Sequence, residues 1–370
     1  MNKTVFARAR ACAIACLGGI AASSAMAQSS VAVYGVLDSG VVYTTNSNAA
    51  GDAVVKVPSL TGSVPSRLGF RGTEDLGGGL QAVFVLENGI GVDTGTAGQG
   101  GRLFGRQAYV GLKGAYGTLM LGRQINMTFL ASVKSDVLGP NLFSMSSIDP
   151  YIPNARSDNA IGYLGAFSDF TVGATYSFGR DASAAGGPAA TGCPGEAAGN
   201  AKACRQVTGL LGYDNKRYGL TATYDIMYGN TGAAAGLSTS DSSDRRATLN
   251  GYAMAGELRL GAGLMARKKV AATRANDLES DLYYLGASYP LMPALTLDGQ
   301  VARHDVKASA NDSTLAVLRL TYSLSKRTAV YSSIGRMRNG GLAAISLDAG
   351  GTVGAGLNQS GLSAGVRHAF

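Results

Sequence analysis

The sequence predicts an all-β fold, a 16-stranded antiparallel transmembrane β-barrel whose third long loop folds inward. Three observations lead to this prediction. The chain starts with an export signal, it continues as short alternating strands with no later apolar helix, and short turns alternate with long loops. Strands can cross a bilayer only in a closed barrel, because lipid offers no hydrogen-bond partners to an open sheet edge.

Residues 1–27 have the composition of a secretory signal peptide. A basic start, an apolar run and a small-x-small cleavage site follow one another: Lys3, Arg8 and Arg10, then residues 11–22, then Ala25-Met26-Ala27. This segment is too short and wrongly flanked for a spanning helix. Cys16 loosely suggests a lipoprotein site, but it lies too early in the apolar run. We expect an exported barrel domain over 28–370 that begins at Gln28.

The length of the mature chain suits one barrel. Removing 27 residues from 370 leaves 343, and a crossing strand takes ~9–11 residues plus a connection, which gives about 16 strands. A composition of 53 Gly and 9 Pro, with no Trp, fits tight turns and strands better than helices. No segment after the signal approaches the ~20 apolar residues of a membrane helix.

The chain is basic, with a formal charge of +8, of which the signal contributes three cations. A nucleic-acid-binding protein would show a basic arm or a stripe of clustered Lys and Arg, and export also argues against that partner. We therefore expect the charge to act on small solutes and inorganic anions. The sequence suggests no cofactor.

Two cysteines remain after the signal, Cys193 and Cys204. In an oxidising compartment such a close pair is expected to form a loop-closing disulfide. A metal site would need more ligands, and His304 and His368 are the only histidines in the chain.

The connections fall into two classes. Seven short turns are expected near 75–79, 113–117, 165–169, 214–217, 256–257, 290–293 and 323–326. Eight long loops are expected near 45–63, 89–103, 125–155, 179–206, 229–246, 270–280, 308–312 and 339–354. Short turns on one side and long loops on the other are typical of bacterial outer-membrane barrels, and a soluble sandwich has no reason to sort its loops in this way.

The strands alternate between apolar and polar residues. In residues 220–228, one set of alternate positions holds Leu, Ala, Tyr, Ile and Tyr, and the other set holds Thr, Thr, Asp and Met. Successive side chains of a strand face opposite sides, so one face is apolar and the other polar. A one-sided antiparallel sheet fits this pattern equally well. Export, strand count and loop asymmetry together favour a barrel with a wet interior.

Several arginines have the inward parity of their strands. Arg67 and Arg71 alternate with apolar neighbours, and the same reasoning turns Arg106 and Arg156 inward. Arg67, Arg106 and Arg156 precede their short turns by similar distances, which places all three about 20 Å above the turns. Three cations at one height in a lumen would form a selectivity element. The alternative is that inward arginines merely solvate a wide pore.

Arg123 has the parity of the apolar residues Leu119 and Leu121, so it is expected to point out of the barrel. A charge that faces mid-bilayer lipid costs ~2–4 kcal/mol. We therefore expect Arg123 to lie in a subunit contact, paired with an acid of another chain.

The loop over 125–155 is unusually long and apolar for a segment washed by water. Beside an arginine-lined lumen, it is best explained by folding inside the barrel. There it would present Asp136 and Lys134 opposite the arginines. The alternative is a surface loop that packs on a neighbouring subunit.

The mature chain resembles the trimeric general-diffusion porins of Gram-negative bacteria, close to their betaproteobacterial branch. The resemblance rests on SVAVYGVLDSGV, PSRLGFRGTEDLGGGLQAVFVLE, LFGRQAYVGLKGAYGTLMLGRQ, RSDNAIGYL, FTVGATYSFG and GVRHAF. It implies a homotrimer in the outer membrane, in contact with lipid and lipopolysaccharide, with a third loop folded into each pore. It also implies that Phe370 is the signal read by the barrel-assembly machinery.

The same resemblance implies a transverse field across the pore. Arg67, Arg106 and Arg156 stand where that family places its basic cluster, and Asp136 stands where it places a loop acid. A second loop acid, commonly four residues further on, is replaced by Pro140. This departure weakens the acidic side, so we expect a preference for anions.

The sequence therefore predicts a passive outer-membrane diffusion channel for small hydrophilic solutes and ions. One alternative is a substrate-specific channel, whose path would show an aromatic ladder; the inward parity here is Thr, Ser, Asp, Gln and Arg. The other is an outer-membrane barrel enzyme, for which His304 with Asp305 is the one candidate pair.

Overall fold

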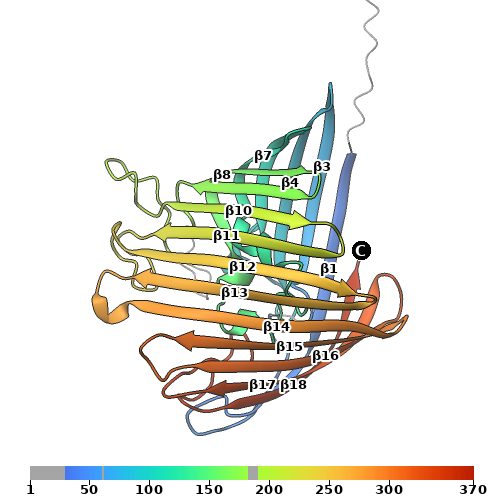
Figure 1. Ribbon diagram of the computed structural model, residues 1–370, viewed down its shortest axis with the longest axis vertical. Coiled ribbons are helices and arrows are strands. Elements are labelled where there is room, and N and C mark those ends of the chain that lie inside the picture. Colours follow the sequence, from blue (N-terminus) through green and yellow to red (C-terminus); the bar gives the residue numbers. More distant parts are fainter. Residues whose placement is uncertain (1–29, 61, 182–190) are drawn as a thin grey trace, which may run out of the picture.

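The computed structural model describes residues 30–60, 62–181 and 191–370. Sixteen long antiparallel strands follow one another around a single closed sheet, which β1 completes by pairing with both β18 and β3 (Figure 1). The predicted 16-stranded barrel is confirmed. The predicted signal peptide over 1–27 lies outside the described residues.

The barrel strands have these bounds: β1 Ser30–Thr44, β3 Arg67–Gly77, β4 Leu80–Gly91, β6 Gln107–Gly114, β7 Gly117–Ile125, β8 Arg156–Phe167, β9 Phe170–Ser177, β10 Gln206–Asp214, β11 Tyr218–Tyr228, β12 Ser243–Ala255, β13 Leu258–Val270, β14 Leu278–Met292, β15 Leu295–Val306, β16 Ser313–Ser323, β17 Thr328–Asn339 and β18 Gln359–Ala369. Two short strands and five helical turns lie within the loops: β2 Val54–Lys56, β5 Thr96–Ala97, α2 Gly98–Gly101, α3 Met127–Ser132, η1 Met145–Ser147, η2 Ile152–Asn154 and η3 Arg274–Asn276.

The short turns use residues that tolerate left-handed backbone. Between β3 and β4, Gly77, Gly78 and Gly79 all have positive φ, and the side chain of Asp75 accepts a hydrogen bond of 2.9 Å from the Gly77 amide. An Asp followed by glycines closes a turn in this way because glycine has no Cβ to clash. Short turns gather at one end of the barrel and long loops at the other, as the sequence predicts.

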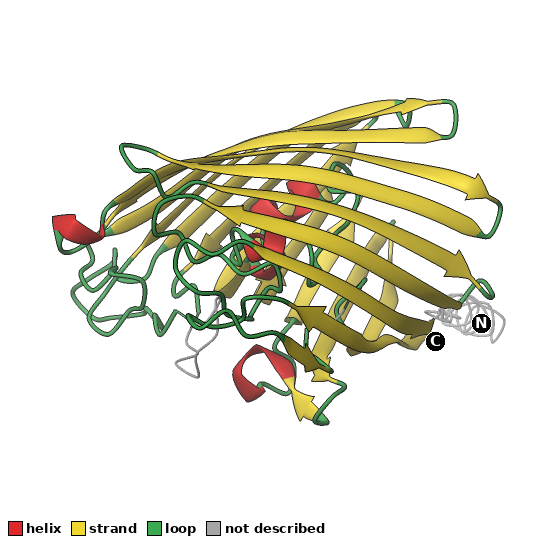
Figure 2. Ribbon diagram, turned by 90° about the horizontal axis from the view of Figure 1, so that it is seen from below, coloured by secondary structure: helices red, strands yellow, loops and turns green. Residues whose placement is uncertain are grey.

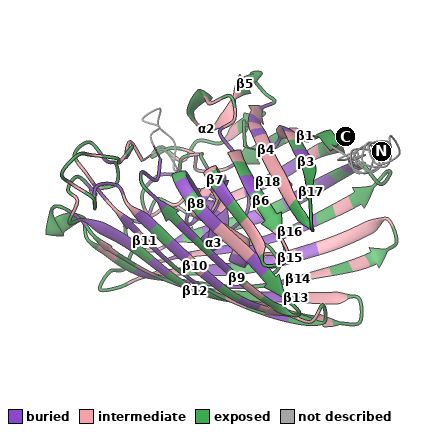
Figure 3. Ribbon diagram, turned by 90° about the horizontal axis from the view of Figure 1, so that it is seen from above, coloured by how far each residue is buried: buried purple, intermediate pink, exposed green. Residues whose placement is uncertain are grey.

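The two faces of the wall differ as the alternation predicts. On β11, Leu220 and Tyr224 face outward and are 53% and 50% exposed, whereas Thr223 and Asp225 are buried on the inner side. Figure 3 shows exposed and buried positions alternating along the strands. Among the described residues, no helix is both long and apolar enough to cross a membrane.

The loop between β7 and β8, residues 126–155, lies inside the barrel, where its short helices are visible in Figure 2. Its apolar side chains pack against the inner wall and form the core of the molecule: Val137, Leu138, Leu142, Phe143, Met145, Ile148 and Ile152 from the loop, with Met265, Leu282, Tyr284, Leu315, Val317 and Met337 from the strands. This burial explains why the loop is so apolar and confirms the inward-folded third loop.

Candidate functional site: an arginine-lined cavity in the barrel

A buried charge network anchors the third loop to the far wall. Asp149 of the loop accepts a hydrogen bond of 3.0 Å from Arg246 of β12, and Arg267 of β13 binds Asp244 at 2.8 Å. The Arg246 guanidinium also stacks 4.4 Å from the centre of the Tyr151 ring. Burial raises the pKa of Asp149, but Arg246 and Arg267 outweigh burial and lower this pKa to about 2. Asp149 therefore stays bound to Arg246 and adds little negative charge to the lumen.

A second anchor holds the two ends of the third loop. Asn126 accepts from the Thr128 amide and begins α3, and the Thr128 hydroxyl donates to Asp225 of β11 at 2.7 Å. The Tyr151 hydroxyl donates to the same carboxylate at 2.6 Å. One buried acid thus joins both ends of the loop to the wall, which makes the loop a fixed constriction.

The first loop also enters the lumen. Asp38 of β1 is buried and accepts hydrogen bonds from the amides of Ser63 and Val64 and, at 2.6 Å, from the hydroxyl of Tyr331 on β17. These bonds hold the following residues, Pro65 and Ser66, against the passage. Asp38 interrupts an apolar strand, which is a signal in the sequence, but no role was predicted for this residue.

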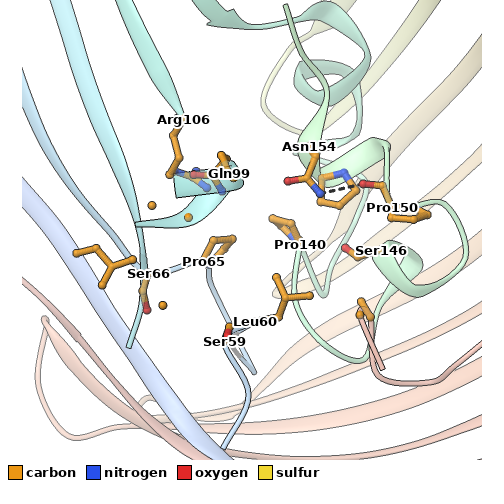
Figure 4. Close-up of a pocket in the computed structure, with 18 of the residues that line it drawn as sticks. Ser59, Leu60, Pro65, Ser66, Gln99, Arg106, Pro140, Ser146, Pro150 and Asn154 are labelled. Atoms are coloured by element: carbon orange, nitrogen blue, oxygen red, sulfur yellow. Dashed lines mark hydrogen bonds between the residues drawn. The ribbon is translucent and has the colours of Figure 1, made fainter. Parts of the chain in front are cut away.

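A cavity of about 330 Å³ lies between the third loop and the wall formed by β3 to β8. Figure 4 shows the loop residues Pro140, Ser146, Pro150 and Asn154 on one side and Arg106 on the other. Arg123 and Arg156 also line it, with Asp181 as the one carboxylate among the described lining residues. Cations thus gather on the barrel side, and proline, serine and asparagine gather on the loop side.

Glu87 of β4 connects two of the predicted arginines. It accepts a hydrogen bond of 2.6 Å from Arg106 and lies 3.6 Å from the nitrogen of Arg67, while the hydroxyl of Tyr34 donates to it at 2.9 Å. No role for Glu87 was predicted from the sequence. A charge inside the apolar run of β4 was the available signal, but Val83 and Val85 share its inward parity and hide the alternation.

Arg123 corrects the sequence analysis. The structure turns its side chain into the lumen, where it pairs with Asp158 of the same chain and donates to the Gly105 carbonyl at 2.7 Å. The pairing of β7 with β8 is irregular between Gly122 and Gln124, and Gly122 has a φ of 125°. The extra residue of this bulge lies in β8, where Asp158 and Asn159 stand opposite Arg123, and the bulge brings the Asp158 carboxylate within reach of Arg123. The prediction that Arg123 points outward to an acid of another chain is wrong.

Two more arginines, Arg102 and Arg156, belong to this charged side of the lumen. Arg102, from the loop between β4 and β6, binds Asp158 at 3.2 Å and Asp181 at 2.8 Å. Arg156 begins β8 and donates to the Asn154 side chain at 3.2 Å, and its Nε has no hydrogen-bond partner within the described part of the chain. Arg102, Asp158 and Asp181 were missed because their approach depends on the paths of separate loops.

The remaining predicted site residues lie outside the cavity. Arg71 faces the lumen 5.2 Å from the ring of Tyr34, four residues nearer the short turns than Arg67. Lys134 is largely exposed and pairs with Asp214 at the end of β10, next to a short turn. Placing Arg71 and Lys134 in the constriction was wrong. A strand position fixes the facing of Arg71 but not the width of the lumen at its height, and the path of the third loop carries Lys134 to Asp214.

Asp136 does not face the arginines. Its carboxylate accepts hydrogen bonds from Gln300 of β15 at 2.9 Å and from the amides of Leu138 and Gly139 at 3.2 and 3.1 Å. The loop directs this carboxylate toward its own backbone amides and toward the far wall. The prediction that Asp136 stands opposite the arginine cluster is therefore corrected.

The charges around the cavity are unequal. We use "arginine cluster" for five side chains: Arg67, Arg102, Arg106, Arg123 and Arg156. Three carboxylates of the described chain bind members of this cluster: Glu87, Asp158 and Asp181. The group as a whole therefore carries a net charge of +2.

A family model described as "Gram-negative porin" matches residues 11–342. The chain belongs to the Gram-negative porin family. It is an outer-membrane channel through which small hydrophilic solutes diffuse passively, and the cavity lies at the constriction formed by its third loop.

Relatives of this porin match it over nearly their whole length. It is 33% identical to outer membrane porin protein 32 of Delftia acidovorans, with 95% of this chain and 97% of the relative covered. It is 30% identical to an outer membrane porin protein of Bordetella pertussis, with 90% and 93% covered. Among solved structures, the anion-selective porin from Comamonas acidovorans is similar with a TM-score of 0.75 and 27% identity, over 93% of this chain and 100% of that one.

Two further features lie away from the porin's lumen. Cys193 and Cys204 form a disulfide in the loop between β9 and β10, with Cα atoms 5.3 Å apart. The backbone of Phe370 exchanges two hydrogen bonds of 3.1 Å with Gly35 of β1. The role of Phe370 as an assembly signal stays a prediction. Within the described residues, no three His, Cys, Asp or Glu side chains are grouped closely enough to hold a metal ion.

Proposed function

We propose that this porin is an anion-preferring diffusion pore that works as a homotrimer in contact with lipopolysaccharide, after insertion by the barrel-assembly machinery. The net positive charge of the arginine cluster carries the anion preference. Low-dielectric walls around a narrow passage focus such a field on the solutes that pass. Similarity to a solved structure described as anion-selective supports the same assignment.

The acids that could offset this field are occupied elsewhere. Asp136 is held by Gln300 and two amides, and Asp149 is held by Arg246. A loop carboxylate that is hydrogen-bonded away from the passage attracts cations weakly. The third loop therefore narrows the pore without supplying an acidic face.

A substrate-specific channel is the second candidate function. Such a channel would present aromatic rings along its path, but the described residues that line the cavity include none. Proline, serine and asparagine form the loop side instead. This surface offers solutes few specific contacts, which favours general diffusion.

We propose no catalytic activity for this porin. The one candidate pair of the sequence, His304 and Asp305, occupies adjacent positions on β15, so the two side chains face opposite sides of the wall. Asp305 lies on the outer side, 2.6 Å from the amine of Lys307. The two groups cannot act together on one substrate.

Liposome swelling tests the proposal with solutes matched in size. We expect gluconate to enter faster than glucose, and glucose faster than glucosamine, because the cluster attracts the anion and repels the cation. The entry rates should rise linearly with concentration and fall steadily with the size of neutral sugars. Saturation of the rate by one sugar would indicate a specific binding site and would contradict general diffusion.

A further inference from the structure

A shallow apolar groove of about 1010 Å³ crosses the outer face of the barrel over β14 to β18. Its floor is formed by small residues on neighbouring strands, Ala287, Gly299 and Ala316. Larger side chains stand on either side of this floor and are more than half exposed: Leu285, Val301, Leu318, Ile334 and Leu362. The groove is therefore lined mainly by apolar side chains, as the binding of an extended hydrocarbon chain requires.

The groove ends at a pair of arginines. Arg336 lines it and donates to the Ser360 hydroxyl at 3.3 Å, and Arg338 follows on the same outer face of β17. Both side chains are exposed. They lie eight and ten residues beyond Thr328, or roughly 19 and 23 Å above the short turns at ~3.3 Å per residue and a tilt of ~45°. The apolar band of such barrels is ~25 Å tall, so the pair lies at its long-loop edge.

These two arginines differ from the outward-facing cations of β13 to β15 at this rim. Arg303 binds Asp312 at 2.7 Å, Lys307 binds Asp281 at 2.8 Å, and Lys268 binds Glu279 at 3.1 Å. Within the described chain, neither Arg336 nor Arg338 has a carboxylate at ion-pair distance. Two guanidinium groups without a carboxylate partner at the edge of the apolar band favour the binding of an anion from outside the chain.

We propose that the groove and these arginines bind one phosphorylated glycolipid of the outer leaflet, with an acyl chain along the groove and a phosphate between Arg336 and Arg338. Guanidinium groups bind phosphate through two parallel hydrogen bonds, which the exposed pair can supply. From the arginine pair, the groove extends toward the middle of the membrane. This inference rests on the proposed contact with lipopolysaccharide and assigns it a site.

A second copy of the chain fits this surface less well. A subunit contact through Arg336 and Arg338 would need free carboxylates at the same height on the partner. The acids at this rim of β14, of β15 and of the loop after β15, namely Asp281, Glu279, Asp305 and Asp312, are already bound to cations of their own. Charge complementarity therefore favours a lipid phosphate over another protomer.

Native mass spectrometry of the whole porin, titrated with purified lipid A in detergent, tests the site. We expect the double variant R336Q/R338Q to bind lipid A about tenfold more weakly or worse, because each lost cation weakens attraction to an anionic headgroup. The matched control R245Q/K268Q also removes two cations from the outer face of this rim, away from the groove, and should bind as the wild type does. Equal binding by both double variants would overturn the proposal.

A second variant tests the groove independently of charge. A316F fills the floor of the groove, and we expect it to weaken lipid A binding, whereas A222F on the outer face of β11 should not. Selective loss of the trimer mass in R336Q/R338Q, without loss of bound lipid, would show a subunit contact and overturn the lipid assignment. Retention of a glycerophospholipid in place of lipid A would also overturn it. All four variants should keep the wild-type zero-current potential. A negative result for lipid A binding would therefore not contradict the anion preference, which the zero-current potential tests separately.

Discussion

The variant R106E is expected to shift the zero-current potential of the pore strongly toward cations. The substitution removes one cation from the arginine cluster and places a second acid beside Glu87, so the net charge of the cluster and its three carboxylates falls from +2 to zero. A unit charge about 6 Å from a passing ion contributes roughly 0.7 kcal/mol in water. Reversing its sign therefore changes the attraction of each ion by about tenfold, in opposite directions for anions and cations, and the anion-to-cation ratio by up to about a hundredfold at low salt.

Two further variants make this measurement specific. E87Q removes an acid from the same group and should shift the potential in the opposite direction, toward anions. R71E reverses a lumen charge that lies outside the cavity, beside Tyr34, and should have a much smaller effect. If R71E and R106E shifted the potential equally, total lumen charge rather than the cluster would set the selectivity.

The variant R246M is expected to loosen the third loop and to lower the unfolding temperature of the barrel. It leaves Asp149 and Asp244 buried beside Arg267 alone, and breaking a buried ion pair by removing one partner costs about 3–5 kcal/mol. Single-channel current should become noisier and the conductance should change, because the loop forms the constriction. The control R245M alters the neighbouring arginine, which is exposed on the outer face.

The same anchor gives the pore a defined response to acid. In the wild type the pKa of Asp149 is lowered to about 2 by Arg246 and Arg267, against the effect of burial. Because this pKa lies below its ordinary value, the carboxylate contributes its full stability above about pH 4, and that stability is lost as pH falls through about 2. Removal of Arg246 lets burial raise this pKa. R246M should therefore show a conductance change at a higher pH than the wild type does, whereas R245M should respond to acid as the wild type does.

The strands and turns were predictable because each is specified locally. An alternation of Leu220, Tyr224 and Thr223 suffices to orient β11, and Asp75 with three glycines suffices to close a turn. Parity counting failed at Arg123, because a bulge in β8 at Asp158 and Asn159, which no regular period reveals, brings a carboxylate beside it.

The partners of the arginines were less accessible from the sequence. Glu87 meets Arg106 only through the register of adjacent strands, and Arg102 reaches Asp158 only through the path of a loop. Asp136 was predicted to face the arginines because of its place in the third loop, but the loop folds that carboxylate back onto its own amides. Loop paths depend on packing against the whole inner wall, so local sequence does not determine them.

The zero-current potential of the wild-type pore in a potassium chloride gradient tests the central claim most directly. The net positive charge around the cavity predicts that chloride crosses faster than potassium, most clearly in dilute salt, and that the preference fades as added salt screens the cluster. A preference for potassium in dilute potassium chloride would contradict the account, because the arginine cluster would then not set the selectivity of the pore.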